Sequence, residues 1–173
     1  MGKTIISQAR GRGSLTYRVR KKAYKYKIGY PLLNTKGTGK VIKLLNSAGH
    51  SAPIAKIIIG NEIFYSPCAN ELYEGQEISI DEGKIGNGNI LRLKYIPQGT
   101  KIFNIELSPG KGGKILRSAG SSGVVMTKDT RGVEIIIKRR KILLNENCRA
   151  TIGTVAGDGR LIKPLVKAGK KHH

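Results

Sequence analysis

The chain has 173 residues, of which 32 are lysine or arginine and 11 are aspartate or glutamate, so its formal net charge is +21 at pH 7. Such an imbalance causes self-repulsion in a free protein and is typical of proteins that bind a polyanion such as nucleic acid. No apolar run is long enough to cross a membrane, and the opening residues lack the apolar core of a secretory signal.

Residues 1–35 are predicted to form a basic extension. All acidic residues lie between Glu62 and Asp158, so cations in the extension alternate only with tyrosines and neutral residues. Lysine and arginine neutralise phosphates, and tyrosine rings stack on exposed bases. The extension has little apolar periodicity, so we expect it to become ordered on its partner. Its candidate RNA contacts are Arg10, Arg12, Arg18, Arg20, Lys21, Lys22, Lys25 and Lys27.

The middle of the chain is predicted to be rich in short strands. Ile54–Ile59 is a β-branched run that ends at a Gly60-Asn61 turn signal. Elsewhere apolar and polar residues alternate, as in half-buried strands, and no segment of ten residues shows a helical stripe. Short strands separated by glycine turns indicate small barrels. The other expected strands are Leu91–Tyr95, Phe103–Leu107, Val124–Met126 and Val133–Ile137, the last two joined through Lys128–Gly132.

The chain is long enough for two such barrels. A proline and a glycine interrupt the strand pattern at Tyr95–Gly99, so we place the boundary near Pro97. The predicted domains are therefore a first barrel over residues 36–96 and a second barrel with the start of a basic tail over residues 97–173.

The loop Pro109–Gly123 combines glycine with Lys111, Lys114 and Arg117 and has no acidic residue. Glycine permits positive φ and lets the backbone approach a ligand closely. Successive backbone N–H groups in such a turn can form a concave anion site. We therefore expect the loop to bind phosphates of a polymer, and a plain glycine-rich hairpin is the alternative.

The sequence offers little evidence of a catalytic site. His50 stands alone in the body of the chain and is interpreted as a surface or phosphate-contacting residue rather than a general base. Cys68 and Cys148 match no metal-binding spacing and are expected to be small buried residues in a reducing compartment. The phosphate-loop pattern of nucleotide enzymes fails, because Ser108 occupies the glycine position and Ile115 follows the lysine. We expect no catalytic activity, cofactor or metal.

Several ordered motifs resemble one known family. They are Ile96-Pro97-Gln98-Gly99-Thr100 with Asn104-Ile105-Glu106, Pro109-Gly110-Lys111-Gly112-Gly113 with Arg117-Ser118-Ala119-Gly120, Cys148-Arg149-Ala150-Thr151-Ile152-Gly153, and Lys167-Ala168-Gly169. In this order, from about Gly37 to His173, they resemble the universal large-subunit ribosomal protein family L-two. The opening, Met1-Gly2-Lys3 with Gln8 and Arg10-Gly11-Arg12-Gly13, resembles the archaeal and eukaryotic branch.

The resemblance implies a mostly β fold, with an OB-like barrel followed by an SH3-like barrel and an extended basic N-terminal segment. It implies a structural constituent of the large ribosomal subunit in the cytoplasm that supports subunit association, transfer-RNA placement and the peptidyl-transferase region. The implied partners are large-subunit ribosomal RNA and neighbouring ribosomal proteins, with no membrane and no self-association.

Beyond the extension, the expected RNA contacts are His50, Gly110, Lys111, Gly112, Gly113, Lys114, Arg117, Ser118, Arg149, Arg160, Lys163, Lys167, Lys170 and Lys171. The family's glycine-rich basic tail, with its Met-Asn-x-Val-Asp-His-Pro-like segment, does not occur in this sequence. His172 and His173 are therefore not expected to take the role of that segment's histidine. A DNA-compacting or chromatin-type protein is the alternative function, whereas an RNA-modifying enzyme would need an acid–base or metal constellation that we do not find in the sequence.

Overall fold

The computed structural model describes residues 21–162 and 164–171. The strands of the first half are β1 (Gly37–Leu45), β2 (Ile54–Ile59), β3 (Glu62–Pro67), β4 (Glu77–Ile80) and β5 (Ile90–Arg92). Those of the second half are β6 (Lys101–Phe103), β7 (Ile105–Glu106), β8 (Gly113–Ile115), β9 (Gly123–Asp129), β10 (Gly132–Ile137), β11 (Arg140–Leu144) and β12 (Arg149–Ile152). The helical turns are all short: η1 (Lys21–Ala23), η2 (Leu93–Tyr95), η3 (Asp158–Leu161) and α1 (Ala168–Lys171).

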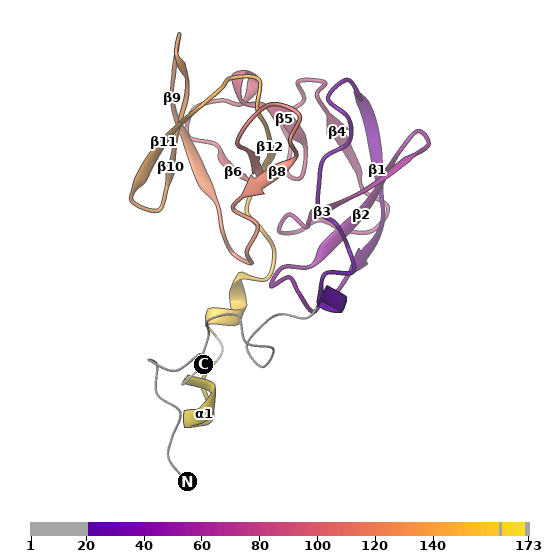
Figure 1. Cartoon of the computed structure of the whole chain (residues 1–173), viewed down its shortest axis with the longest axis vertical. Coiled ribbons are helices and arrows are strands. Elements are labelled where there is room, and N and C mark those ends of the chain that lie inside the picture. The colour runs from indigo at the N-terminus through magenta and orange to yellow at the C-terminus, as the bar shows by residue number, and fades with distance from the viewer. Residues whose placement is uncertain (1–20, 163, 172–173) are drawn as a thin grey trace.

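Ten of these strands form one continuous sheet in the order β11-β10-β9-β6-β12-β5-β4-β1-β2-β3, and β7 and β8 form a separate hairpin. Every neighbouring pair is antiparallel except β4 and β5. The sheet curls into two barrel-like lobes, one around β1–β4 and one around β9–β11, with β5 and β12 between them (Figure 1). This confirms the predicted mostly β architecture of two small barrels.

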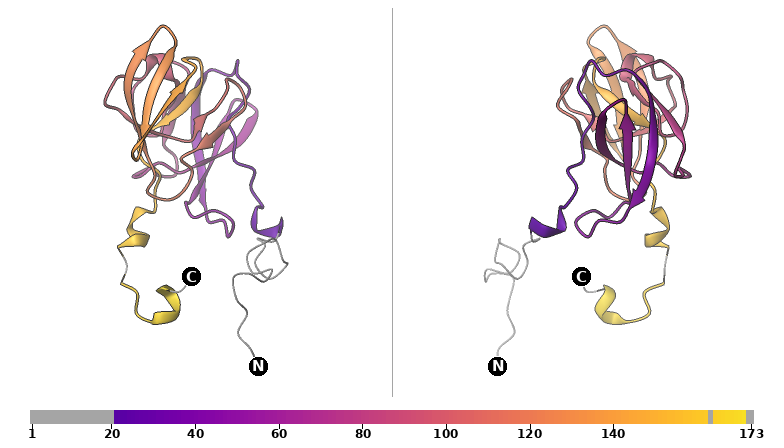
Figure 2. Two further views of the ribbon diagram at one scale, coloured as in Figure 1. Left: turned by 60° about the vertical axis from the view of Figure 1, so that its left-hand side comes forward. Right: turned by 90° about the vertical axis from the view of Figure 1, so that its right-hand side faces the viewer.

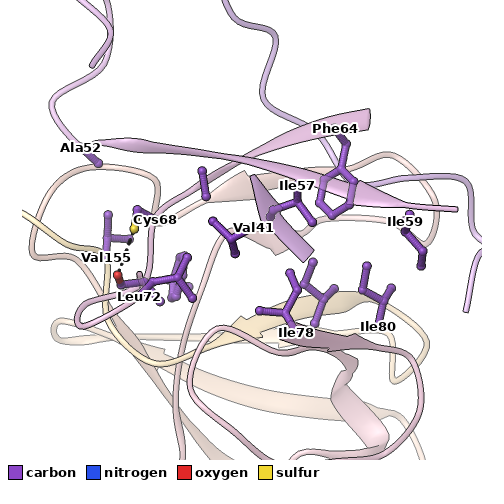
Figure 3. Packing of buried hydrophobic residues seen from close by; sticks show 14 residues of the cluster. Val41, Ala52, Ile57, Ile59, Phe64, Cys68, Leu72, Ile78, Ile80 and Val155 are labelled. Carbon is purple, nitrogen blue, oxygen red and sulfur yellow. Dashed lines mark hydrogen bonds between the residues drawn. The ribbon is translucent and has the colours of Figure 1, made fainter. Parts of the chain in front are cut away.

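Each lobe has its own apolar core. In the first, side chains from β1 to β4 face one another, among them Val41, Ile57 and Ile78 (Figure 3). The second core includes Leu91, Leu93 and Ile96, and the first includes Phe103 and Val155 from late in the chain. A few residues on either side of Pro97 therefore pack in the other lobe's core, and the domain boundary near Pro97 stays a prediction.

Two expected strands differ from the structure at their polar residues. Leu91–Tyr95 alternates as a strand only to Arg92 and then turns into η2, which leaves Tyr95 exposed. In Phe103–Leu107 the alternation is lost, since Asn104 and Glu106 are as fully buried as Phe103 and Ile105, and Leu107 is exposed. Asn104 lies at φ +49, which breaks the strand between β6 and β7. The other expected strands are confirmed as β2, β9 and β10, and β9 and β10 are joined as expected in an antiparallel hairpin.

Part of the predicted extension is packed on the lobes. We call residues 28–33 the N-terminal strap. Ile28 is buried and forms a parallel bridge with Tyr65, whose carbonyl accepts a hydrogen bond from the Gly29 N–H at 3.0 Å. Tyr30 and Pro31 also pack inward. The strap therefore belongs to the folded body, because Ile28, Tyr30 and Pro31 pack inward although the segment shows no apolar periodicity, whereas Leu32 is exposed.

The described segments at the two ends of the chain lie at one end of the molecule. Figure 1 shows η1, η3 and α1 below the two lobes, and Figure 2 shows the same arrangement from two other sides. The described residues in and beside these elements include the exposed Lys22, Lys25 and Lys167, so this end carries positive charge.

Candidate nucleic-acid interface

An open cleft of about 450 Å³ brings together two segments that the sequence predicted to bind RNA. One wall comes from residues 24–28, which follow η1, and the other from residues 111–117 around β8. The lining residues are Tyr24, Tyr26, Lys27, Ile28, His50, Lys111, Gly113, Lys114 and Arg117. Four of these are cations and none is an acid, so the cleft attracts anions.

The loop between β7 and β8 presents two of these cations. Gly110 and Gly112 have φ of +78° and +70°, a left-handed conformation that other residues adopt only at a cost. Lys111 lies between them and Lys114 lies on β8, and both side chains are exposed. The glycines therefore turn the chain, and the lysines carry the charge into the cleft.

The backbone N–H groups of this loop bind an internal anion. The fully buried Glu106 carboxylate accepts hydrogen bonds from the Gly110 N–H at 3.3 Å and from the Gly112 N–H at 3.0 Å. It also accepts the Arg149 N–H at 2.9 Å and two guanidinium N–H groups of Arg149, at 3.0 and 3.3 Å. These N–H groups therefore hold the protein's own carboxylate, and the concave anion site predicted for phosphate is filled.

Arg149 differs from the prediction for the same reason. Its side chain is 1% exposed and forms a buried ion pair with Glu106. Its Nη1 donates to the Leu32 carbonyl at 3.2 Å, and the Tyr30 ring lies 5.2 Å from its guanidinium carbon. The Tyr30 hydroxyl donates to the Asn104 carbonyl at 2.7 Å, and burial raises the Tyr30 pKa. Arg149 thus ties the strap to the loop from inside the protein rather than from its surface.

Arg117 and Gly113 join the loop to the strap. The Arg117 Nε donates to Asn104 Oδ1 at 3.2 Å, and its Nη2 donates to the Ile28 carbonyl at 2.9 Å. A Cβ at Gly113 would collide with the backbone oxygen and side chain of Asn104. Gly113 is therefore required by the fold, whereas Arg117 holds both walls of the cleft and places its charge there.

His50 lies at the edge of the cleft beside Tyr24. The two rings meet edge to face at 5.4 Å, and His50 Nδ1 is 2.9 Å from the Ser47 hydroxyl. Partial burial and the nearby charge of Arg117 lower the His50 pKa, which favours the neutral imidazole. A phosphate placed in the cleft would act in the opposite direction and raise the His50 pKa.

Residues 86–173 match the family described as Ribosomal Proteins L2, C-terminal domain. The whole chain aligns with proteins named "Large ribosomal subunit protein uL2" at 41% identity in Methanothermobacter thermautotrophicus, 42% in Methanococcus maripaludis and 38% in Korarchaeum cryptofilum. These alignments cover 100% of this chain and 75%, 75% and 73% of the relatives. The chain belongs to the L2 family of ribosomal proteins. These relatives are archaeal, in agreement with the branch predicted from the opening residues.

The other predicted contacts of this L2-family chain are partly outside the described structure. Lys22, Lys25, Lys27, Ser118 and Lys167 are exposed. Arg10, Arg12, Arg18, Arg20 and Lys163 lie outside the described residues, and of Lys21, Arg160, Lys170 and Lys171 only the backbone is described, in η1, η3 and α1. Their contacts with RNA stay predictions.

Sequence reasoning missed two features of the basic surface. Glu106 supports the loop from beneath. It belongs to the Asn104-Ile105-Glu106 motif that carried the family resemblance, but its alternation with apolar residues is typical of an exposed strand residue, so its burial was not predicted. Four consecutive exposed cations, Lys138 to Lys141, occupy the turn between β10 and β11 and the first two positions of β11. This run was visible in the sequence directly after an isoleucine-rich strand.

The cysteines are buried and unpaired, as predicted. Burial raises the pKa of Cys68 and of Cys148 to about 11, so both are thiols near neutral pH. Within residues 21–162 and 164–171, no group of three or more His, Cys, Asp and Glu side chains is placed to hold a metal ion. None of the helices in that part of the chain has the length and apolar character needed to span a membrane.

Proposed function

We propose that this chain is a structural constituent of the large ribosomal subunit and binds large-subunit ribosomal RNA through the cleft described above. The observation that carries the proposal is the meeting of Lys27, Lys111, Lys114 and Arg117 around one acid-free cleft. Family membership supports it, because the relatives carry the name of a large ribosomal subunit protein.

The mechanism is electrostatic and geometric. Exposed lysines release counterions from RNA phosphates when they bind. Tyr24 and Tyr26 offer ring faces on which an unpaired base can stack. The loop contributes side-chain charge rather than backbone N–H groups, since Gly110 and Gly112 already donate to Glu106.

Neighbouring ribosomal proteins complete the proposed set of partners, and we propose that the chain does not self-associate. Support of subunit association, transfer-RNA placement and the peptidyl-transferase region is part of the proposal that the family resemblance supplies. Within the proposed function, RNA binding at the cleft is the part that the chain's own residues support.

The test is the double variant Lys111→Glu with Lys114→Glu, titrated as the full chain against large-subunit ribosomal RNA at several salt concentrations. We expect at least a tenfold loss of affinity and a shallower salt dependence, because two phosphate contacts are lost and two repulsions are gained. The matched control is Lys40→Glu with Lys43→Glu, which makes the same charge change at exposed positions of β1 outside the cleft.

Equal losses in the two double variants would contradict the assignment to the cleft, since only total charge would then matter. Equal affinity for duplex DNA of the same length would favour the DNA-compacting alternative. Thermal unfolding of each variant shows whether the fold is retained.

A further inference from the structure

The turn between β10 and β11 is a second basic surface. We call residues 138–141 the basic tip. All four side chains, Lys138, Arg139, Arg140 and Lys141, are exposed. Ile137 pairs with Arg140, so only Lys138 and Arg139 form the turn, and Lys138 lies at φ +56. Figure 1 shows this turn at the side of the second lobe that faces away from β1–β4.

The basic tip borders an open cavity of about 590 Å³. The described lining consists of Ile137 and Ile142, which are half-buried, and Lys138, Arg139 and Arg140. The volume falls in the range of small-molecule sites, roughly 300–1,000 Å³. The site therefore combines an apolar floor with a cationic rim.

The charge of the tip is little neutralised within the described residues. Lys141 pairs with Glu134 at 3.4 Å, and the ion pairs found in that part of the chain involve neither Arg139 nor Arg140. The tip shares no lining residue with the cleft around Lys111. It is thus a separate site with cations available to a partner.

We propose that the basic tip binds an unpaired nucleotide of the large-subunit ribosomal RNA. The base lies against Ile137 and Ile142, and the flanking phosphates lie against Lys138, Arg139 and Arg140. An RNA duplex would offer phosphates alone and leave the isoleucine floor exposed, whereas unpaired nucleotides can offer a base face and phosphates together. The inference rests on the proposed binding of ribosomal RNA and adds a site to it.

The first measurement uses the unaltered full chain bound to in vitro transcribed large-subunit ribosomal RNA. Ultraviolet irradiation followed by peptide mass spectrometry is expected to find a nucleotide adduct within residues 137–142. Carbodiimide treatment of intact subunits tests the competing partner, because it joins lysines to carboxylates. A link from Lys138 or Lys141 to a neighbouring protein, with no nucleotide adduct, would overturn the proposal in favour of an acidic protein segment.

The second measurement compares Arg139→Gln/Arg140→Gln with the matched control Lys128→Gln/Arg131→Gln. The control removes two exposed cations at the β9–β10 turn of the same sheet. We expect the tip variant to lose about tenfold in affinity for the RNA and its adduct, because two phosphate contacts disappear. The control is expected to lose no more than about threefold.

Wild-type affinity in the tip variant together with no adduct in the unaltered chain would refute the second site. If in the same titrations Lys111→Glu/Lys114→Glu still loses affinity, the proposed function stands and only the basic tip is excluded. If the unaltered chain itself fails to bind the RNA, the proposed function fails and the basic tip falls with it.

Discussion

The glycine loop between β7 and β8 and the basic tip between β10 and β11 are both basic turns, yet they are supported in opposite ways. The loop bends around Glu106, whose carboxylate accepts hydrogen bonds from the loop and from Arg149. The basic tip closes as a two-residue turn, and among the described residues the one ion pair found there joins the exposed Lys141 to the half-buried Glu134. The two turns are therefore similar in composition, but the loop depends on contacts with the buried core, whereas the basic tip depends on local backbone geometry.

The largest expected contrast comes from removing one carboxylate at each place. Glu106→Gln leaves Arg149 buried without a counter-charge and turns an amide N–H group toward existing donors, so we expect a loss of about 3–5 kcal/mol in the free energy of unfolding. Glu134→Gln removes the charge of the half-buried partner of Lys141 and keeps a side-chain oxygen for the Thr127 hydroxyl, so it should cost less than about 1 kcal/mol. Urea denaturation of both variants measures the difference.

Equal stability of the two variants would show that Glu106 is not the support of the loop. The affinity of the folded fraction of Glu106→Gln for RNA, measured by titration, is a second and independent test of the same support. We expect weaker binding there without any change in exposed cations, because Lys111 loses its fixed position.

A smaller contrast comes from two opposite substitutions, one that replaces a glycine in the loop and one that introduces a glycine in the basic tip. Gly113→Ala brings a Cβ onto the Asn104 carbonyl and should lower the free energy of unfolding by roughly 2 kcal/mol, as overpacking does. Lys138→Gly relieves a left-handed residue and should raise it by roughly 0.5 kcal/mol. Gly159→Ala, where a Cβ meets nothing within 4 Å, is the neutral control for the first change.

Thermal unfolding followed by circular dichroism ranks these three variants. Stability of Gly113→Ala equal to that of Gly159→Ala would assign Gly113 to ligand approach rather than to the fold. Destabilisation by Lys138→Gly would mean that the lysine side chain itself, rather than the turn, holds the basic tip.

The smallest expected effect is a pH dependence confined to the cleft. Burial and Arg117 lower the His50 pKa in the free protein, and an RNA phosphate would raise it, so binding takes up a proton. Affinity for RNA should therefore rise as the pH falls from 7.5 to 5.5, about tenfold for each pKa unit gained on binding. Titrations at both pH values should show this rise in the unaltered chain and lose it in His50→Gln, while Arg139→Gln/Arg140→Gln keeps it.

The two-barrel architecture and the basic character of the loop were largely predictable, because β-branched runs and clustered cations are local signals. Ile54–Ile59 became a strand within its predicted bounds, and Lys111 and Lys114 are exposed on the loop and β8. The pairing of the loop with residues 24–28 was not encoded in any local pattern.

The supporting residues escaped prediction for a physical reason. Glu106 and Asn104 occupy the polar positions of an alternating strand, and alternation alone assigns such positions to solvent. Their burial is stabilised by Arg149, Arg117 and Tyr30, which come from elsewhere in the chain. Only the folded structure shows that these groups satisfy one another.

The contacts of the N-terminal strap also determine when the strap can be anchored during synthesis of the chain. Tyr30 binds the Asn104 carbonyl and the Thr151 hydroxyl, which lie 74 and 121 residues later in the chain. At a synthesis rate of about 5–20 residues per second, roughly 6–24 s separate the making of Tyr30 from that of Thr151. Throughout that interval the nascent strap lacks its final anchor, and the tyrosines and lysines beside it are exposed to any polyanion nearby. Strand β12, the last of the described strands, therefore anchors the N-terminal strap.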